Sequence, residues 1–165
     1  MLTLKVCLHR AQCTIAQLAA DLCISSSSQV HASIRRSRAA GLLDKDALAA
    51  RPGPVYEFTV HGVKYAFPAV LGPVARGVPT AHSGPGFREE FGRSDPLVWP
   101  HPDGKKRGVS VSPLHGSVPD AALTDPALHK AQAAVDCFRV GMARERKFAA
   151  QVLEELLLGG DRRRK

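Results

Sequence analysis

The stretch AQLAADLCISSSSQVHASIRRSRAAGLL, residues 16–43, decides the fold because it holds two helical patterns separated by a short break. Leu18 and Leu22 recur at helical spacing before the run of serines, and Val30 and Ile34 recur after it. Two helices joined by so few residues cannot lie side by side as a long hairpin. We therefore expect them to cross at a steep angle, with three arginines on the second helix.

Residue types that begin and end helices flank both patterns. Thr14 is placed to cap the first helix, and Ser25 or Ser26 is placed to cap the second. Gly41 suits the left-handed conformation that commonly ends a helix. A further short helix is expected over residues 2–10, so this part of the chain is predicted to contain three helices.

The 165-residue chain has a formal net charge of +8 at pH 7, with 23 Lys and Arg against 15 Asp and Glu. This balance favours a polyanionic partner, either nucleic acid or an acidic membrane surface, although a merely basic soluble protein is the alternative. No apolar run reaches the length that spans a membrane, and the start of the chain lacks the pattern of a secretory signal. We therefore predict a cytoplasmic protein without membrane contact.

The four cysteines, Cys7, Cys13, Cys23 and Cys137, form no CxxC pair. One interpretation is that they are free thiols, mostly buried, in a reducing compartment. The alternative is a redox sensor or a metal site built from Cys7, His9 and Cys13, but that spacing matches no common zinc pattern. The sequence therefore predicts no metal and no cofactor.

The stretch VYEFTVHGVKYAFP, residues 55–68, alternates between apolar or aromatic and other side chains. If His61 and Gly62 form a two-residue loop, the strands on either side place six large side chains on one face. These side chains are Tyr56, Phe58, Val60, Val63, Tyr65 and Phe67. We expect a β-hairpin whose aromatic face is covered by helices.

The rest of the chain divides by composition. Residues 69–123 are rich in Pro and Gly and predict an irregular segment, with a possible small hairpin that turns at 102–104. From Asp125 onward apolar residues recur seven apart, which predicts one long helix over 124–158, followed by a basic tail at 159–165. The apolar stripe of that helix predicts a dimer seam; packing against the hairpin is the alternative.

The two short helices, the tight break, the ending glycine and the hairpin resemble the winged helix-turn-helix of bacterial transcriptional regulators, a broad superfamily that includes MarR-like proteins. The resemblance covers residues 2–68 and is carried by TIAQLAADLCIS and VHASIRRSRAAGLL. It departs at Cys23, where glycine is usual, and between Ile24 and Val30, which is one residue longer. The expected fold is mainly α with small β (α+β), with the winged helix-turn-helix over 1–68.

The resemblance implies that the N-terminal part of the second helix meets base edges in the major groove of DNA. Gln29 suits adenine, and Arg35 is placed to reach either guanine or a phosphate. Arg36 and Arg38 are expected to bind phosphates. The resemblance implies that the hairpin touches the flanking minor groove; the alternative is that it covers its own core without touching DNA. The predicted DNA-binding residues are Ser26, Ser27, Ser28, Gln29, His31, Arg35, Arg36, Arg38, His61 and Lys64.

These features predict a sequence-specific transcriptional regulator that binds double-stranded DNA as a homodimeric repressor. The alternative is an antitoxin-like or other subunit that docks a protein partner, because the Pro- and Gly-rich segment is suited to wrapping one. Enzyme chemistry is not indicated. Arg76 and His82 form the candidate nuclease pair but lie in an expected loop, and Asp95, Asp103 and Asp120 are scattered rather than paired.

Overall fold

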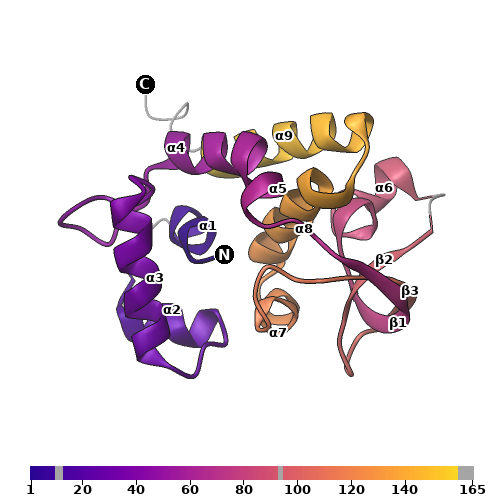
Figure 1. Cartoon of the computed structure of the whole chain (residues 1–165), viewed down its shortest axis with the longest axis horizontal. Helices are drawn as coiled ribbons and strands as arrows, with labels where there is room; N and C mark the ends of the chain where they lie inside the picture. The colour runs from indigo at the N-terminus through magenta and orange to yellow at the C-terminus, as the bar shows by residue number, and fades with distance from the viewer. Residues whose placement is uncertain (10–12, 93–94, 160–165) are drawn as a thin grey trace.

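The computed structural model describes residues 1–9, 13–92 and 95–159, and the fold is mainly helical with a small sheet. Figure 1 shows α1, α2 and α3 at one end of the molecule and the sheet at the other. The N-terminal elements are α1 (Leu2–Leu8), α2 (Ile15–Asp21), α3 (Ser27–Ala39), α4 (Pro52–Glu57), the π-helix η1 (Phe58–Gly62) and α5 (Val63–Ala66). They are followed by β1 (Leu71–Pro79), η2 (Ala81–Ser83), α6 (Arg88–Phe91), β2 (Leu97–Pro100), β3 (Lys106–Val111), α7 (Val118–Thr124), α8 (Pro126–Val140) and α9 (Ala143–Leu157).

The three helices predicted before the hairpin are confirmed, with bounds within two residues of those expected. Thr14 caps α2, because its side chain accepts a hydrogen bond from the Gln17 N–H at 3.1 Å. The three helices share an apolar cluster with α7 and α8. Its buried members are Leu2, Val6, Leu18, Leu22, Val30, Ile34, Leu43, Ala121 and Leu128. The N-terminal helices therefore pack directly on the C-terminal part of the chain.

The β-hairpin predicted over 55–68 is wrong, because α4, η1 and α5 make this segment helical. Two prolines at the first turn favour the start of a helix. Val55, Thr59 and Val63 are buried, and their spacing of four residues fits one side of a helix as well as it fits strands. The large side chains left exposed are Phe58, Tyr65 and Phe67. The aromatic face that was expected to be covered by helices therefore does not form.

The sheet lies within the segment 69–123, which was expected to be irregular. β1 pairs antiparallel with both β2 and β3, and β2 and β3 pair parallel with each other, so the three strands close on themselves. Strands flank the turn predicted at 102–104, but they do not pair with each other as a hairpin. A Cβ at Gly77 would lie 2.0 Å from Trp99 O, so closure of the strands requires glycine there.

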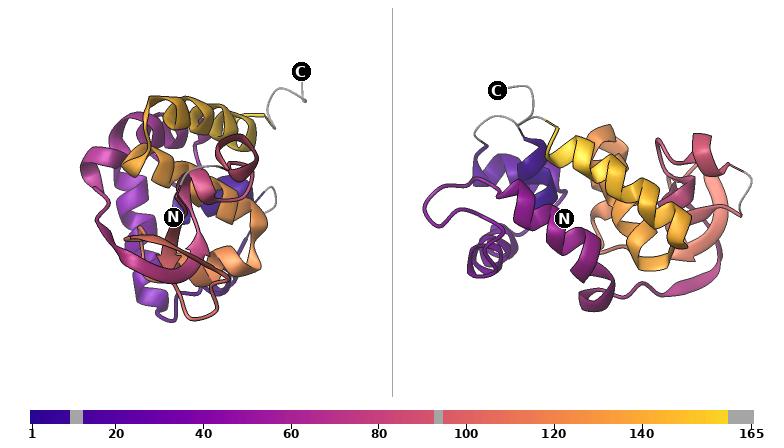
Figure 2. Two further views of the ribbon diagram at one scale, coloured as in Figure 1. Left: turned by 90° about the vertical axis from the view of Figure 1, so that its right-hand side faces the viewer. Right: turned by 90° about the horizontal axis from the view of Figure 1, so that it is seen from above.

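The single helix predicted over 124–158 is also wrong, because the chain leaves the helix at Gly141 and resumes it after Met142. The cap predicted at Asp125 is confirmed, since its side chain accepts a hydrogen bond from the Leu128 N–H at 3.0 Å. α9 folds back along α8, as Figure 2 shows. No helix in the described part of the chain is both long and apolar enough to cross a membrane.

The apolar stripe of the C-terminal helices is buried inside the chain itself. Leu128 and Val135 are 1 % exposed and Ala149 is fully buried, whereas Met142, at the break, is 78 % exposed. This stripe therefore packs in the core of a single chain. The prediction that it forms the interface of a dimer is wrong.

A buried carboxylate ties α8 to the sheet. Asp136 Oδ2 accepts hydrogen bonds from Thr80 Oγ1 at 2.7 Å and Trp99 Nε1 at 2.6 Å. Asp136 Oδ1 pairs with Arg139 at 2.6 Å, and the Arg139 guanidinium also donates to Ser112 O. Burial raises the pKa of Asp136, although the charge of Arg139 opposes that shift. The network fixes the sheet against the helices.

Candidate nucleic-acid interface

The turn between α2 and α3 contains a residue in the left-handed conformation that usually requires glycine, although the turn has no glycine. Cys23 has a φ of 51°, in the left-handed region that favours glycine. The Ile24 N–H donates to Ala19 O at 2.9 Å and the Cys23 N–H donates to Ala20 O at 3.0 Å. This pair of bonds is a Schellman motif, which ends α2 and turns the chain sharply into α3.

Most of the predicted contact residues of α3 lie on its exposed side. Val30 and Ile34 face the core and are 0 % and 5 % exposed. The exposed members of the predicted set on this helix are Ser27, Ser28, Gln29, His31, Arg35 and Arg36. Ser26 is half-buried and stands at the N-cap without a side-chain cap bond. The outer side of α3 is thus polar and cationic, with its inner side packed on the core.

Arg38 has a role that the sequence analysis missed. Its guanidinium donates to Asp44 O at 3.2 Å and to Asp46 O and Ala47 O at 3.4 Å. These bonds hold the loop that follows α3 against the end of the helix. The expected phosphate contact at Arg38 therefore competes with three main-chain oxygens of the chain itself.

The loop after α3 is a minimal hairpin. Leu43 and Ala50 form an antiparallel bridge, and the Asp44 N–H donates to Ala49 O at 2.8 Å. The Asp44 carboxylate accepts two main-chain N–H bonds at the tip, which lower its pKa. Both Figure 1 and Figure 2 show this loop between α3 and α4 projecting from the body of the molecule.

His61 and Lys64 lie on helices instead of a hairpin. His61 lines a cavity of about 990 Å³ that separates α3 from η1 and α5, and Gln29 and Arg36 line the opposite side. Lys64 does not line this cavity, and its ammonium lies 4.8 Å from the centre of the Tyr65 ring. The structure therefore places His61 across a groove from α3 and directs Lys64 elsewhere.

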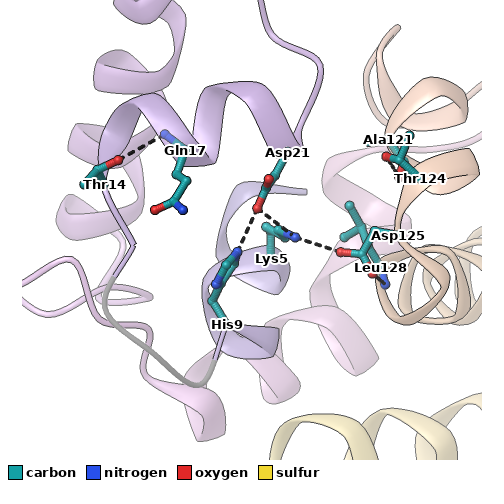
Figure 3. Close-up of polar contacts among 9 residues, drawn as sticks. All are labelled: Lys5, His9, Thr14, Gln17, Asp21, Ala121, Thr124, Asp125 and Leu128. Atoms are coloured by element: carbon teal, nitrogen blue, oxygen red, sulfur yellow. Dashed lines mark hydrogen bonds and ion pairs between the residues drawn. The ribbon is translucent and has the colours of Figure 1, made fainter.

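A buried lysine that the sequence analysis missed links α1 to both α2 and α8. Figure 3 shows Lys5 Nζ between Asp21, at 3.0 Å, and Asp125, at 2.8 Å, while His9 Nε2 lies 2.7 Å from Asp21. The hydrogen bond to His9, together with Lys5, holds the pKa of Asp21 below its usual value against the effect of burial. Burial opposes the charge of Lys5, but its bonds to Asp125 and Asp21 outweigh burial and raise its pKa.

Two of the residues that were considered as metal ligands, His9 and Cys7, have other surroundings in the structure. His9 is engaged with Asp21, and burial raises the pKa of the Cys7 thiol to about 12. A signal for the cluster does exist in the sequence, because Lys5 stands among apolar residues in a short helix. A buried lysine requires a carboxylate partner.

Comparisons of the chain with protein-family models, curated proteins and solved structures gave no significant match.

Proposed function

We propose that the chain is a transcriptional regulator that binds double-stranded DNA by inserting α3 into the major groove. The groove is about 12 Å wide and admits one helix. Supporting features are the sharp α2–α3 turn, the polar outer side of α3 and the net charge of +8. Gln29 and Arg35 offer side chains that pair with adenine and guanine, respectively.

The observation that carries the proposal is the exposure of α3 along its outer side. α3 begins at Ser27 and remains exposed on that side through Ala39, while its inner side is closed by the apolar cluster. His31 and Arg35 stand one turn apart on this exposed surface. A helix presented in this way can approach a duplex without any rearrangement of the core.

The minimal hairpin at 42–51 supports the same mode of binding. It directly follows α3, which is the position that the wing takes in winged helix-turn-helix proteins. Lys45 is exposed at its tip, and Arg38 anchors it to α3. We assign to this loop the contact beside the major groove that the sequence analysis expected from residues 55–68.

The proposed regulator is a homodimer, because reading two half-sites requires two copies of α3. Since the C-terminal stripe is buried within the chain, the dimer uses a different surface. Among the described residues, the segment from α5 into β1 holds a run of exposed apolar side chains: Tyr65, Phe67, Val70, Leu71 and Val74. Exposed apolar patches of this kind mark interaction sites in soluble proteins.

Variants of α3 test the proposal directly. On a fragment selected from genomic DNA, Gln29→Ala and Arg35→Ala are each expected to weaken specific binding by about 1–3 kcal/mol, because each removes a base contact. Arg36→Ala is expected to weaken binding to all sequences alike, as loss of a phosphate contact does. Fluorescence anisotropy at several salt concentrations measures both effects.

Arg146→Ala on α9 is the matched control, because it removes the same charge away from α3. Binding of the three α3 variants at the affinity of Arg146→Ala would show that α3 does not touch DNA.

A further inference from the structure

The end of the molecule opposite α3 carries a second group of cations. The register of β1 and β3 places Arg76 directly opposite Arg107 and Gly77 opposite Lys106. Arg76, Arg107, Lys106 and the neighbouring Lys105 are all exposed. Like charges directly opposite each other destabilise a strand pair, so this arrangement is unfavourable for the isolated sheet. A bound polyanion would remove that cost.

The described part of the chain forms no ion pair with these four cations. Lys106 and Arg107 are adjacent on a strand, so their side chains project to opposite sides of β3. The cations therefore surround the start of β3 instead of forming a single row, and they remain available to a partner.

A small cavity of about 130 Å³ lies on the Lys106 side. Its polar lining comes from His82, Ser83, Arg88 and Lys106, and no described carboxylate lines it. The Ser83 hydroxyl accepts the Leu97 N–H at 3.0 Å, which leaves its own O–H as a donor. Two cations and a hydroxyl donor around one cavity form the chemistry that binds a phosphate group.

The His82 ring is held in place at the same cavity. His82 Nε2 lies 2.9 Å from Asp95 O, and Nδ1 lies 3.3 Å from Glu145 Oε1 on α9. The polar lining of the cavity thus comes from η2, α6 and β3, and Glu145 at the start of α9 holds the His82 ring.

We propose that this end of the molecule binds the sugar-phosphate backbone of double-stranded DNA. Arg76, Lys105 and Arg107 contact phosphates around the start of β3, and one further phosphate sits in the cavity on the Lys106 side, between Arg88 and Lys106. The choice of duplex DNA rests on the proposed function, whereas the phosphate chemistry comes from these residues alone. None of the contacts reads bases, so this surface is a second, sequence-independent anchor that is separate from α3.

The test compares two triple variants that remove the same charge. Arg76→Gln, Lys105→Gln and Arg107→Gln are combined in one protein, and Lys130→Gln, Arg146→Gln and Lys147→Gln in the control. Binding to a duplex of arbitrary sequence is measured by fluorescence anisotropy between 50 and 200 mM salt. We expect the first variant to lower the slope of log K against log salt by about 2–3, at about 0.9 per phosphate contact, and the control to leave it unchanged.

A second variant, Arg88→Gln with Lys106→Gln, isolates the cavity and is expected to lower the slope by about 1, for one phosphate. Circular dichroism at the assay temperature confirms that each variant is folded. The variant with Arg76→Gln, Lys105→Gln and Arg107→Gln is called the sheet triple variant. The proposal is overturned if this variant binds the duplex with the same affinity and the same salt slope as the control.

An α3 variant separates this proposal from the proposed function. If Arg35→Gln with Arg36→Gln leaves binding unchanged while the sheet triple variant weakens it, the second anchor stands and the function assigned to α3 fails. If only the α3 variant weakens binding, the second anchor alone is overturned. Sedimentation with anionic phosphatidylglycerol vesicles adds a further arm: loss of vesicle binding with unchanged duplex binding would assign the surface to lipid and overturn the proposal.

Discussion

At the scale of the residue, Cys23 shows how a sharp turn between two helices forms without a glycine. A non-glycine residue in the left-handed region costs about 1–2 kcal/mol, but the two main-chain bonds of the Schellman motif satisfy groups that would otherwise be unpaired. Cys23 stands where the related pattern has glycine, and its backbone nevertheless adopts the left-handed conformation that favours glycine. The neighbouring packing of Leu22 and Ile34 thus determines the turn more strongly than the intrinsic preference of one residue.

Replacement of Cys23 by glycine is expected to stabilise the protein by about 0.5–1 kcal/mol, because relief of the left-handed conformation exceeds the added entropy of the unfolded chain. Cys23→Val is expected to destabilise it by about 1 kcal/mol or more, since β-branched residues tolerate positive φ poorly. Urea denaturation measures both. Ser25→Gly, at a position without positive φ, is the control and is expected to destabilise; stabilisation by both glycine variants would contradict this account.

At the scale of the element, the sequence predicted helices correctly where the apolar residues fit only the helical period. It failed where the same residues fit both the helical period and the alternation of a strand. α1, α2 and α3 combine apolar spacing with identifiable caps, so their positions were predictable. Val55, Thr59 and Val63 satisfy helical spacing while the same segment also alternates like a strand, and only the tertiary packing decides between them. The extra residue of the π-helix has no sequence signal.

The break between α8 and α9 was not predicted from the sequence, for a related reason. Apolar residues recur seven apart on both sides of Gly141, so the stripe continues through a point where the backbone turns back. The closed sheet depends on pairings of β1 with two later strands, and such long-range register cannot be read from local pattern. Among the candidate site residues, exposure along α3 was predictable from Val30 and Ile34, whereas the loop contacts of Arg38 were not.

The link between α1, α2 and α8 gives a prediction about these elements. Lys5→Met is expected to lower the free energy of unfolding by roughly 2–4 kcal/mol, because it leaves the Asp21 and Asp125 carboxylates close together without their shared cation. Lys147→Met on α9 removes an exposed lysine and is expected to change stability by less than about 0.5 kcal/mol. Equal stability of the two variants in urea denaturation would show that Lys5 does not join these helices.

At the scale of the whole molecule, two polar, cationic surfaces lie at opposite ends of a helical body. α3 and the loop after it lie at one end, the sheet with its cations lies at the other, and α8 runs between them (Figure 1). The apolar residues of α5 and β1 lie between these charged ends in the chain order. This arrangement suits a protein that contacts DNA and a second copy of itself with different surfaces.

The proposed dimer surface makes a prediction about oligomeric state. Leu71→Glu combined with Val74→Glu is expected to convert a dimer to a monomer, because it places charges in a surface that must lose water on association. Leu123→Glu with Met142→Glu changes two exposed apolar residues elsewhere and is expected to leave the dimer intact. Sedimentation equilibrium measures both; a wild-type protein that is monomeric at micromolar concentration would contradict the dimer and favour a different protein partner for this surface.

Photo-crosslinking from α3 tests the central claim most directly. A photoreactive amino acid is placed at Gln29 on α3 or, as the control, at Gln151 on α9, both of which are exposed. The duplex is a fragment selected from genomic DNA. We expect crosslinks to bases from position 29 and none from position 151. A bound complex that crosslinks from position 151, or from neither position, would contradict the insertion of α3 into the major groove.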